Sequence, residues 1–174
     1  MRTLETARLT LEPLLAAPAP AMFGILGDPA IYTFENAPPP SLAWLQERYT
    51  KLESRRSVDG TEAWLNWVLR LRSGGLIGAV QATLGDDGRA FIAYELASAH
   101  WGRGLASEAV TAMIDELAVH YRAHLLVTVF KRANTRSRRL LERLGFSAAA
   151  AGSVTAQGDE DAMQRRLAVA VEAR

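Results

Sequence analysis

A short apolar run, a turn with two glycines and a long amphipathic run follow one another between Phe91 and Tyr121. The first run, FIAYEL, is typical of a buried β-strand. From Leu105 onward the apolar side chains recur every three or four residues, which predicts a helix. A strand that passes through so tight a turn into a helix requires a fold in which sheet and helix pack in layers.

The turn, WGRGLA at residues 101–106, leaves backbone N–H groups bare at the start of the predicted helix. Together with the positive end of the helix dipole they suit a phosphate or pyrophosphate. A P-loop is excluded, because no lysine lies near Gly104. A dinucleotide-binding turn is excluded too: Ser107 stands where its third glycine belongs, and no acidic residue ends the next strand at Phe130.

The rest of the chain alternates strand-like and helix-like segments without a repeat or a linker, so we expect a single domain over residues 1–174. The order is β, α, α, three antiparallel strands, then α, β, α, β, which is typical of a mixed α/β or α+β domain. The expected strands are residues 7–14, 64–72, 76–84, 91–96 and 125–130, with a turn at 157–161 and a last strand within 163–171. The expected helices begin near Pro18, at Ser41, at Leu105 and at Asn134.

Composition excludes several classes of function. The chain carries 20 basic and 19 acidic side chains, and its formal net charge of +1 provides no field toward nucleic acid or an anionic membrane. It has no cysteine, and its three histidines show no ligand spacing with carboxylates, so we expect no metal. No stretch approaches the roughly 18 apolar residues of a membrane helix, and Glu5 and Glu12 interrupt any signal peptide. We expect a cytoplasmic protein with no membrane or nucleic-acid partner.

The glycine turn resembles the loop that binds the pyrophosphate of acyl-CoA in the GCN5-related N-acetyltransferases, the GNAT superfamily. That loop has the pattern Q/R-x-x-G-x-G/A, and Gly104 and Ala106 take its two small positions. Trp101 stands at the first position, where tryptophan is common in the branch that resembles the bacterial RimJ/RimL acetyltransferases of ribosomal proteins.

A second stretch is similar to a downstream motif of the same family, N-x-x-S-x-x-x-x-E-K/R-x-G-F. The matching residues of NTRSRRLLERLGF are Asn134, Ser137, Glu142, Arg143, Gly145 and Phe146. An ordinary helix that begins with an asparagine cap and ends at a glycine would show several of the same residues without any role in binding a cofactor. Because the two motifs occur in the family's order, the resemblance extends over the motif-bearing core, about residues 7–146.

This resemblance implies the GNAT fold: a mixed, mostly antiparallel central sheet flanked by helices. Acetyl-CoA, as co-substrate, would lie in a V-shaped cleft between the strands that end near Leu96 and Phe130. The acetyl group would pass directly to a primary amine, such as a protein or peptide α-amine or a small-molecule amine. The co-substrate would be bound by Leu96, Ala97, Trp101, Gly102, Arg103, Gly104, Leu105, Ala106, Ser107, Asn134 and Ser137, with the Leu96 N–H polarising the acetyl carbonyl.

Two departures from the family concern proton transfer. Many relatives carry a tyrosine as general acid where this chain has Leu141, and Ser137, one turn earlier, is the expected substitute. Its alternative role is that of an ordinary residue in the first turn of the helix. Many relatives also carry a glutamate early in the central strand, where this chain has Ala90 and Phe91.

The nearest carboxylate to that position is Glu95, in a strand of apolar residues, and burying it unpaired would be costly. It is the expected base, unless it is solvated or paired to an arginine, and Glu35 is the second candidate. An α-amine is roughly a fifth neutral at pH 7.4 and a lysine about one part in a thousand. A site without a strong base therefore favours an acceptor amine of low pKa.

Two other functions remain open at this stage. A catalytically degenerate member that only binds acyl-CoA would also lack the tyrosine and the early glutamate. A nucleic-acid module would use the basic residues between Lys131 and Arg143. The acceptor pocket would be lined by Trp44, Tyr49, Trp64, Trp67 and Gln81, unless these belong to the core. An acidic pocket would predict a polyamine or aminoglycoside and a narrow groove a peptide terminus; the protein would be a monomer or a homodimer.

Overall fold

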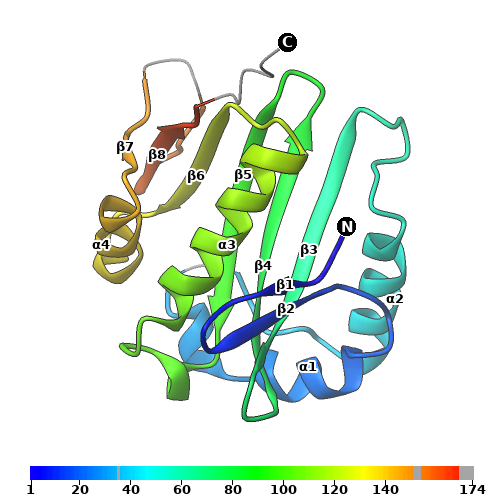
Figure 1. Cartoon of the computed structure of the whole chain (residues 1–174). Helices are drawn as coiled ribbons and strands as arrows, with labels where there is room; N and C mark the ends of the chain where they lie inside the picture. The colour runs from blue at the N-terminus through cyan, green and yellow to red at the C-terminus, as the bar shows by residue number, and fades with distance from the viewer. Residues whose placement is uncertain (35, 151–153, 169–174) are drawn as a thin grey trace.

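The computed structural model describes the chain except residues 35, 151–153 and 169–174. Its described strands form one mixed sheet in the order β1-β2-β3-β4-β5-β6-β8-β7, in which β5 and β6 are the parallel neighbours (Figure 1). The bounds are β1 Leu4–Glu5, β2 Leu9–Pro13, β3 Glu62–Leu71, β4 Leu76–Gly85, β5 Arg89–Leu96, β6 Leu125–Lys131, β7 Ser147–Ala148 and β8 Glu160–Arg166.

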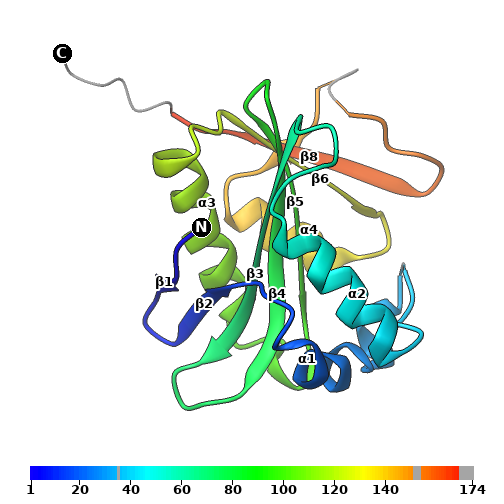
Figure 2. The ribbon, with the colours of Figure 1, turned by 90° about the vertical axis from the view of Figure 1, so that its right-hand side faces the viewer.

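Helices cover both faces of this sheet, as Figure 2 shows for α2 and α3 on opposite sides. The described α-helices are α1 Ala19–Leu26, α2 Leu42–Glu53, α3 Leu105–His120 and α4 Thr135–Arg143, and two short 3₁₀ turns are η1 Pro29–Tyr32 and η2 Ser98–His100. The larger apolar cluster lies under α3, and a smaller one joins α1 and α2 to the sheet. Among the described residues no helix has the length and apolar character to cross a membrane.

The helix starts follow local chemistry that the sequence predicts. The Ser41 hydroxyl caps α2 by accepting a hydrogen bond from the Trp44 N–H at 3.1 Å, and Asn134 caps α4 in the same way. These capping side chains accept N–H groups that the helix itself leaves unpaired. The predicted mixed, mostly antiparallel sheet flanked by helices is confirmed.

The predicted turn at 157–161 and the last strand are partly wrong, because β8 already begins at Glu160. Acidic residues around its start pair with basic residues around the end of β6: the Lys131 Nζ lies 2.8 Å from Asp159, and Arg132 lies 3.1 Å from Asp161. These ion pairs support a polar strand between β6 and β7 that has no apolar pattern. Residues 169–171 of the predicted strand lie outside the described residues, and the short β7 was not predicted.

The parallel pair β5–β6 separates partway along its length. Only Arg89, Ala90 and Phe91 of β5 have partners on β6, although β5 continues to Leu96 and β6 to Lys131. On its other side β6 stays paired to β8 over its whole length. The opening between the two central strands is the predicted V-shaped cleft.

Candidate active site

The glycine turn opens α3 as the sequence predicts. Gly102 and Gly104 have φ angles of 73° and 75°, in the left-handed region that favours glycine, and Gly104 is the N-cap of α3. Within the described part of the chain no side chain caps this helix end. The first N–H groups of α3 are therefore left for a ligand, with the partial positive charge of the helix dipole behind them.

The turn is held in place by the connection between β1 and β2. The Arg8 guanidinium donates to the Arg103 carbonyl at 2.7 Å, and Glu108, in the first turn of α3, accepts from the Thr6 hydroxyl at 2.6 Å and the Arg8 N–H at 2.8 Å. Burial alone would raise the pKa of Glu108, but these hydrogen bonds outweigh it and lower the pKa. Glu108 is therefore an anion at neutral pH and fixes the turn electrostatically.

A cavity of about 460 Å³, here called the loop cavity, adjoins the turn. Arg136 and Arg143, two turns apart on one side of α4, face it and supply positive charge. Arg103 does not line the loop cavity; its guanidinium lies 3.4 Å from the His100 ring. Of the predicted co-substrate residues, those that line it are Leu96, Trp101, Gly102, Gly104, Leu105, Ala106 and Ser107.

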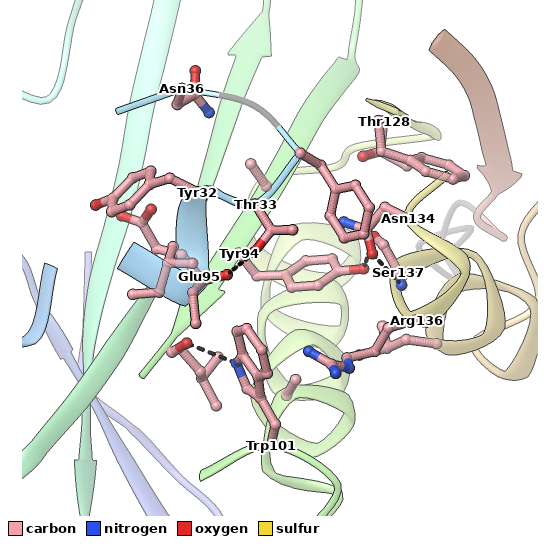
Figure 3. A pocket seen from close by; sticks show the side chains of 18 of the residues that line it. Tyr32, Thr33, Asn36, Tyr94, Glu95, Trp101, Thr128, Asn134, Arg136 and Ser137 are labelled. Carbon is pink, nitrogen blue, oxygen red and sulfur yellow. Dashed lines mark hydrogen bonds between the residues drawn. The ribbon is translucent and has the colours of Figure 1, made fainter. Parts of the chain in front are cut away.

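Trp101 takes the place of the polar or charged residue that begins the loop pattern. Its indole N–H donates to the Leu96 carbonyl at 2.8 Å and so closes the end of β5 (Figure 3). The Arg136 guanidinium lies over this indole, 4.0 Å from the ring centre. The indole therefore orients a cation from α4 beside the turn, where this chain has a tryptophan in place of the glutamine or arginine of the motif.

A second cavity, of about 320 Å³, fills the opening between β5 and β6 and is here called the cleft cavity. It is lined by residues 93–96 of β5, residues 128–130 of β6, Asn134 and Ser137. Residues 30–34 cover one side. The loop and cleft cavities share Leu96, Trp101, Ala106, Arg136 and Leu140. They form one groove that leads from the glycine turn to the split in the sheet.

The β4–β5 register decides which backbone groups of β5 face the cleft. The Ala97 N–H donates to the Ile77 carbonyl at 2.9 Å, and the Ala97 carbonyl accepts from His100 at 3.0 Å, so both Ala97 groups are engaged. In an antiparallel pair hydrogen-bonded and non-bonded residues alternate. Leu96, opposite Gly78, is therefore a non-bonded position, and its N–H points away from β4 toward the cleft.

Tyr94, which sequence reasoning missed, lies beside the predicted acid. Its hydroxyl is 2.6 Å from the Ser137 hydroxyl (Figure 3), and the Ser137 N–H donates to Asn134 at 3.1 Å. Burial raises the pKa of Tyr94 to about 12, although the Ser137 hydrogen bond opposes this rise. Tyr94 is therefore protonated at neutral pH. Leu141, where relatives carry a tyrosine, is fully buried in the core.

Glu95 lies on the opposite face of β5 from Tyr94, because successive side chains of a strand alternate. It lines both the cleft cavity and a pocket of about 470 Å³ between the sheet and α2, here called the acceptor pocket. Burial raises the pKa of Glu95, and the nearby Arg48 partly opposes this. Its side chain forms no hydrogen bond or ion pair with the described residues, so the carboxylate is available to a ligand.

The acceptor pocket contains some of the predicted aromatic residues. Trp44, Tyr49 and Gln81 line it. Trp67 instead lies fully buried in the core, and Trp64 is covered by the Lys51 ammonium, 5.6 Å from its ring centre. The core alternative is thus correct for Trp67.

Residues 30–34 and Asn36 line the cleft cavity, and of these Tyr32 and Asn36 also line the acceptor pocket. Asp28 fastens this segment by accepting the Ser98 N–H at 2.7 Å and the Ala30 N–H at 3.0 Å. Glu35, the second candidate base, lies outside the described residues. The described residues contain no cluster of three side chains that could ligate a metal ion.

Known proteins resemble the chain over nearly its whole length. It is similar to an uncharacterized N-acetyltransferase, p20, of Bacillus licheniformis, with 28% identity over 148 residues, 84% of this chain and 83% of that protein. The fold is similar to that of ribosomal-protein-S5-alanine acetyltransferase from Vibrio fischeri (TM-score 0.79, 16% identity, covering 95% and 97% of the two chains). It is also similar to that of spermidine N-acetyltransferase from Vibrio cholerae in complex with CoA and spermine (TM-score 0.76, 20% identity, covering 92% and 96%).

The family model of the acetyltransferase (GNAT) domain matches residues 8–147, a range that holds the glycine turn, the split strands and the residues of both cavities of the groove. The chain therefore belongs to the GNAT family of acetyltransferases.

Proposed function

We propose that the chain transfers the acetyl group of acetyl-CoA directly to a primary amine that enters through the acceptor pocket. One observation carries the proposal: Tyr94 and Glu95 are adjacent in β5 and face opposite sides of it, where the cleft cavity meets the acceptor pocket. A proton donor for the thiol and a proton acceptor for the amine thus border the same reaction point.

The groove fits acetyl-CoA by its chemistry. The bare N–H groups of the glycine turn and the guanidinium groups of Arg136 and Arg143 suit the phosphates. The narrow split between β5 and β6 suits the pantetheine arm, with Asn134 at its edge. Since the Ala97 N–H is engaged with β4, we assign the Leu96 N–H as the donor to the acetyl carbonyl.

The proposed reaction proceeds in one addition and one elimination. Glu95 accepts the proton that the ammonium must lose, and the amine nitrogen attacks the thioester carbonyl carbon. The Leu96 N–H stabilises the negative charge that develops on the carbonyl oxygen. The carbon–sulfur bond then breaks with its electron pair on sulfur, and Tyr94 protonates the thiolate. The nitrogen loses its second proton to solvent as the amide forms, and a proton from solvent restores Tyr94 through the Ser137 hydroxyl. An amide, free CoA and one released proton are the products.

The proposal is tested by incubating the purified chain with acetyl-CoA and a panel of primary amines. Because the chain has no cysteine, a thiol reagent detects only the CoA that is released. We expect thiol release that depends on the amine, with the acetylated amine identified by mass spectrometry. If CoA binds in a titration but no amine is acetylated, the chain is an acyl-CoA-binding protein without catalysis, and the proposal is wrong.

Arg136 provides a separate check on where the phosphates bind. We expect Arg136→Ala to raise the KM for acetyl-CoA about tenfold and to leave kcat within about threefold, because a phosphate contact is a charge-assisted hydrogen bond that the transition state does not change. Arg139→Ala is the matched control, since Arg139 is exposed on α4 and lines neither cavity. Equal KM values for the two variants would place the phosphates elsewhere.

A further inference from the structure

We infer that the acceptor is a primary amine that also carries a carboxylate, an α-amino acid, with its ammonium at Glu95 and its carboxylate at Arg48. The inference rests on the proposed function and names its substrate class. Both residues line the acceptor pocket, Glu95 from β5 and Arg48 from α2. Among the described residues that line this pocket, Glu95 is the one acidic residue and Arg48 the one basic residue.

Arg48 has no anionic partner among the residues that the structure describes. Its guanidinium lies instead by Trp44, whose ring centre is 5.5 Å from the guanidinium carbon. Some arginines elsewhere in the fold are paired, Arg8 with Glu108 and Arg70 with Glu12, whereas no described carboxylate lies within 4.0 Å of Arg48. A cation that is oriented by an aromatic ring and left without a carboxylate is free to bind an anionic group of a ligand.

Arg48 and Glu95 share the pocket without forming an ion pair. Arg48 is near enough to oppose the rise of the Glu95 pKa, yet no nitrogen–oxygen contact within 4.0 Å joins these two described residues. Two opposite charges held apart in one pocket match the two charges of a zwitterion, whose groups would complete both interactions. The other polar lining groups are neutral amides, including Asn66 and Gln81, and the phenols of tyrosines.

The same charges disfavour two other acceptor classes. A polyamine would place its second ammonium near the Arg48 guanidinium, and like charges at close range repel. The N-terminus of a peptide has an amide where an amino acid has its carboxylate, so it would leave Arg48 without a partner. The described pocket is therefore not the acidic pocket that a polyamine or an aminoglycoside would favour.

The experiment compares three forms of one side chain: L-phenylalanine, L-phenylalaninamide and 2-phenylethylamine, with the same series built on methionine, and spermidine as the polycation. KM values are referred to the concentration of free base, because the three amines differ in pKa. We expect the amino acid to have a KM about 10- to 100-fold below that of its amide or its decarboxylated form, since the carboxylate adds a charge-assisted hydrogen bond.

Variants assign this preference to Arg48. Arg48→Met keeps the length of the side chain and removes its charge, so we expect the KM for the amino acid to rise about 10- to 100-fold and that for the decarboxylated amine to stay unchanged. Arg48→Lys should restore part of the preference. Lys51→Met is the matched control, because Lys51 is also a cation of α2 that lies over a tryptophan, Trp64 of β3, but does not line the acceptor pocket.

The outcomes separate this inference from the proposed function. If amines are acetylated but the amino acids show no advantage over their decarboxylated forms, or spermidine is preferred, the inference is wrong and the proposed function stands. An amino-acid preference that Arg48→Met leaves intact also overturns the assignment. If no amine is acetylated, the proposed function fails and the inference fails with it.

Discussion

Glu95→Gln is expected to lower kcat at neutral pH by about 100-fold or more, because general-base catalysis typically contributes a factor of this size. The substitution keeps the shape of the side chain and removes its ability to accept a proton. Glu95 lines both the cleft cavity and the acceptor pocket, and no described group of the protein hydrogen-bonds to its oxygens. Steady-state assays with acetyl-CoA and the best amine of the panel measure the effect.

The pH profile provides the second readout. Burial raises the pKa of Glu95 above its usual 4.5, so the acid limb of kcat should lie above that value in the wild type. In Glu95→Gln this limb should disappear. Glu47→Gln is the matched control, since Glu47 lies exposed on α2 outside the acceptor pocket and the cleft cavity. Wild-type kcat across the profile in the Glu95→Gln variant would exclude Glu95 as the base.

Glu95→Gln, which is expected to lower kcat, is expected to raise the stability of the fold at neutral pH. A carboxyl group whose pKa is raised by folding stabilises the fold below its unfolded pKa and loses that contribution as the pH rises through its folded pKa. The wild type and Glu95→Gln should therefore unfold alike near pH 4, and the variant should become the more stable protein as the pH rises above the usual 4.5. Thermal unfolding at a series of pH values measures this. A variant that loses both activity and stability at neutral pH would indicate a structural role.

Sequence patterns predicted the elements that depend on local chemistry. The asparagine cap of α4, the serine cap of α2 and the glycine turn before α3 follow from the residues at those positions. The β5–β6 cleft followed from the resemblance to a family and from no pattern in the strands themselves. Where pairing stops is a tertiary property, since β5 and β6 both continue as strands beyond their last pair, Phe91 with Val127.

The site was predicted less completely, for a physical reason that β5 illustrates. Sequence reasoning treated FIAYEL as an apolar strand with one exceptional carboxylate and overlooked the phenol of Tyr94. Adjacent residues of a strand face opposite sides, so the pair Tyr94–Glu95 gives one polar group to each face, and that signal is present in the sequence. The Tyr94–Ser137 contact spans 43 positions, however, and only the packing of α4 beside β5 brings the two hydroxyls together.

Arg48 was missed, and Arg136 was predicted only as one member of a basic run, for a different reason. Each lies on an exposed helix turn in a chain with many arginines, and sequence alone does not distinguish a solvated arginine from one oriented over an indole. The nucleic-acid alternative depends on the same run of basic residues. Lys131, Arg132 and Arg138, half of the basic run, form ion pairs with Asp159, Glu160 and Asp161.

Tyr94→Phe is expected to lower kcat about 10- to 100-fold, because the leaving thiolate loses its proton donor while the ring that lines the cleft stays in place. Ser137→Ala should lower kcat in the same direction. If the two hydroxyls, 2.6 Å apart, act as one unit, the double variant should be no slower than the slower single variant. Because the pKa of Tyr94 is raised to about 12, its loss should leave the alkaline limb of the wild-type profile below about pH 10 unchanged.

Two measurements distinguish this catalytic role from a structural one. A structural role would move the melting temperature and the affinity for CoA, whereas proton donation to the thiolate moves kcat and leaves CoA binding by titration unchanged. Tyr121→Phe is the matched control, since Tyr121 is a partly buried phenol at the end of α3 and lines neither the groove nor the acceptor pocket. Additive losses in the double variant would mean that Ser137 and Tyr94 act separately, and wild-type kcat in the Tyr94→Phe variant would assign the thiolate another donor.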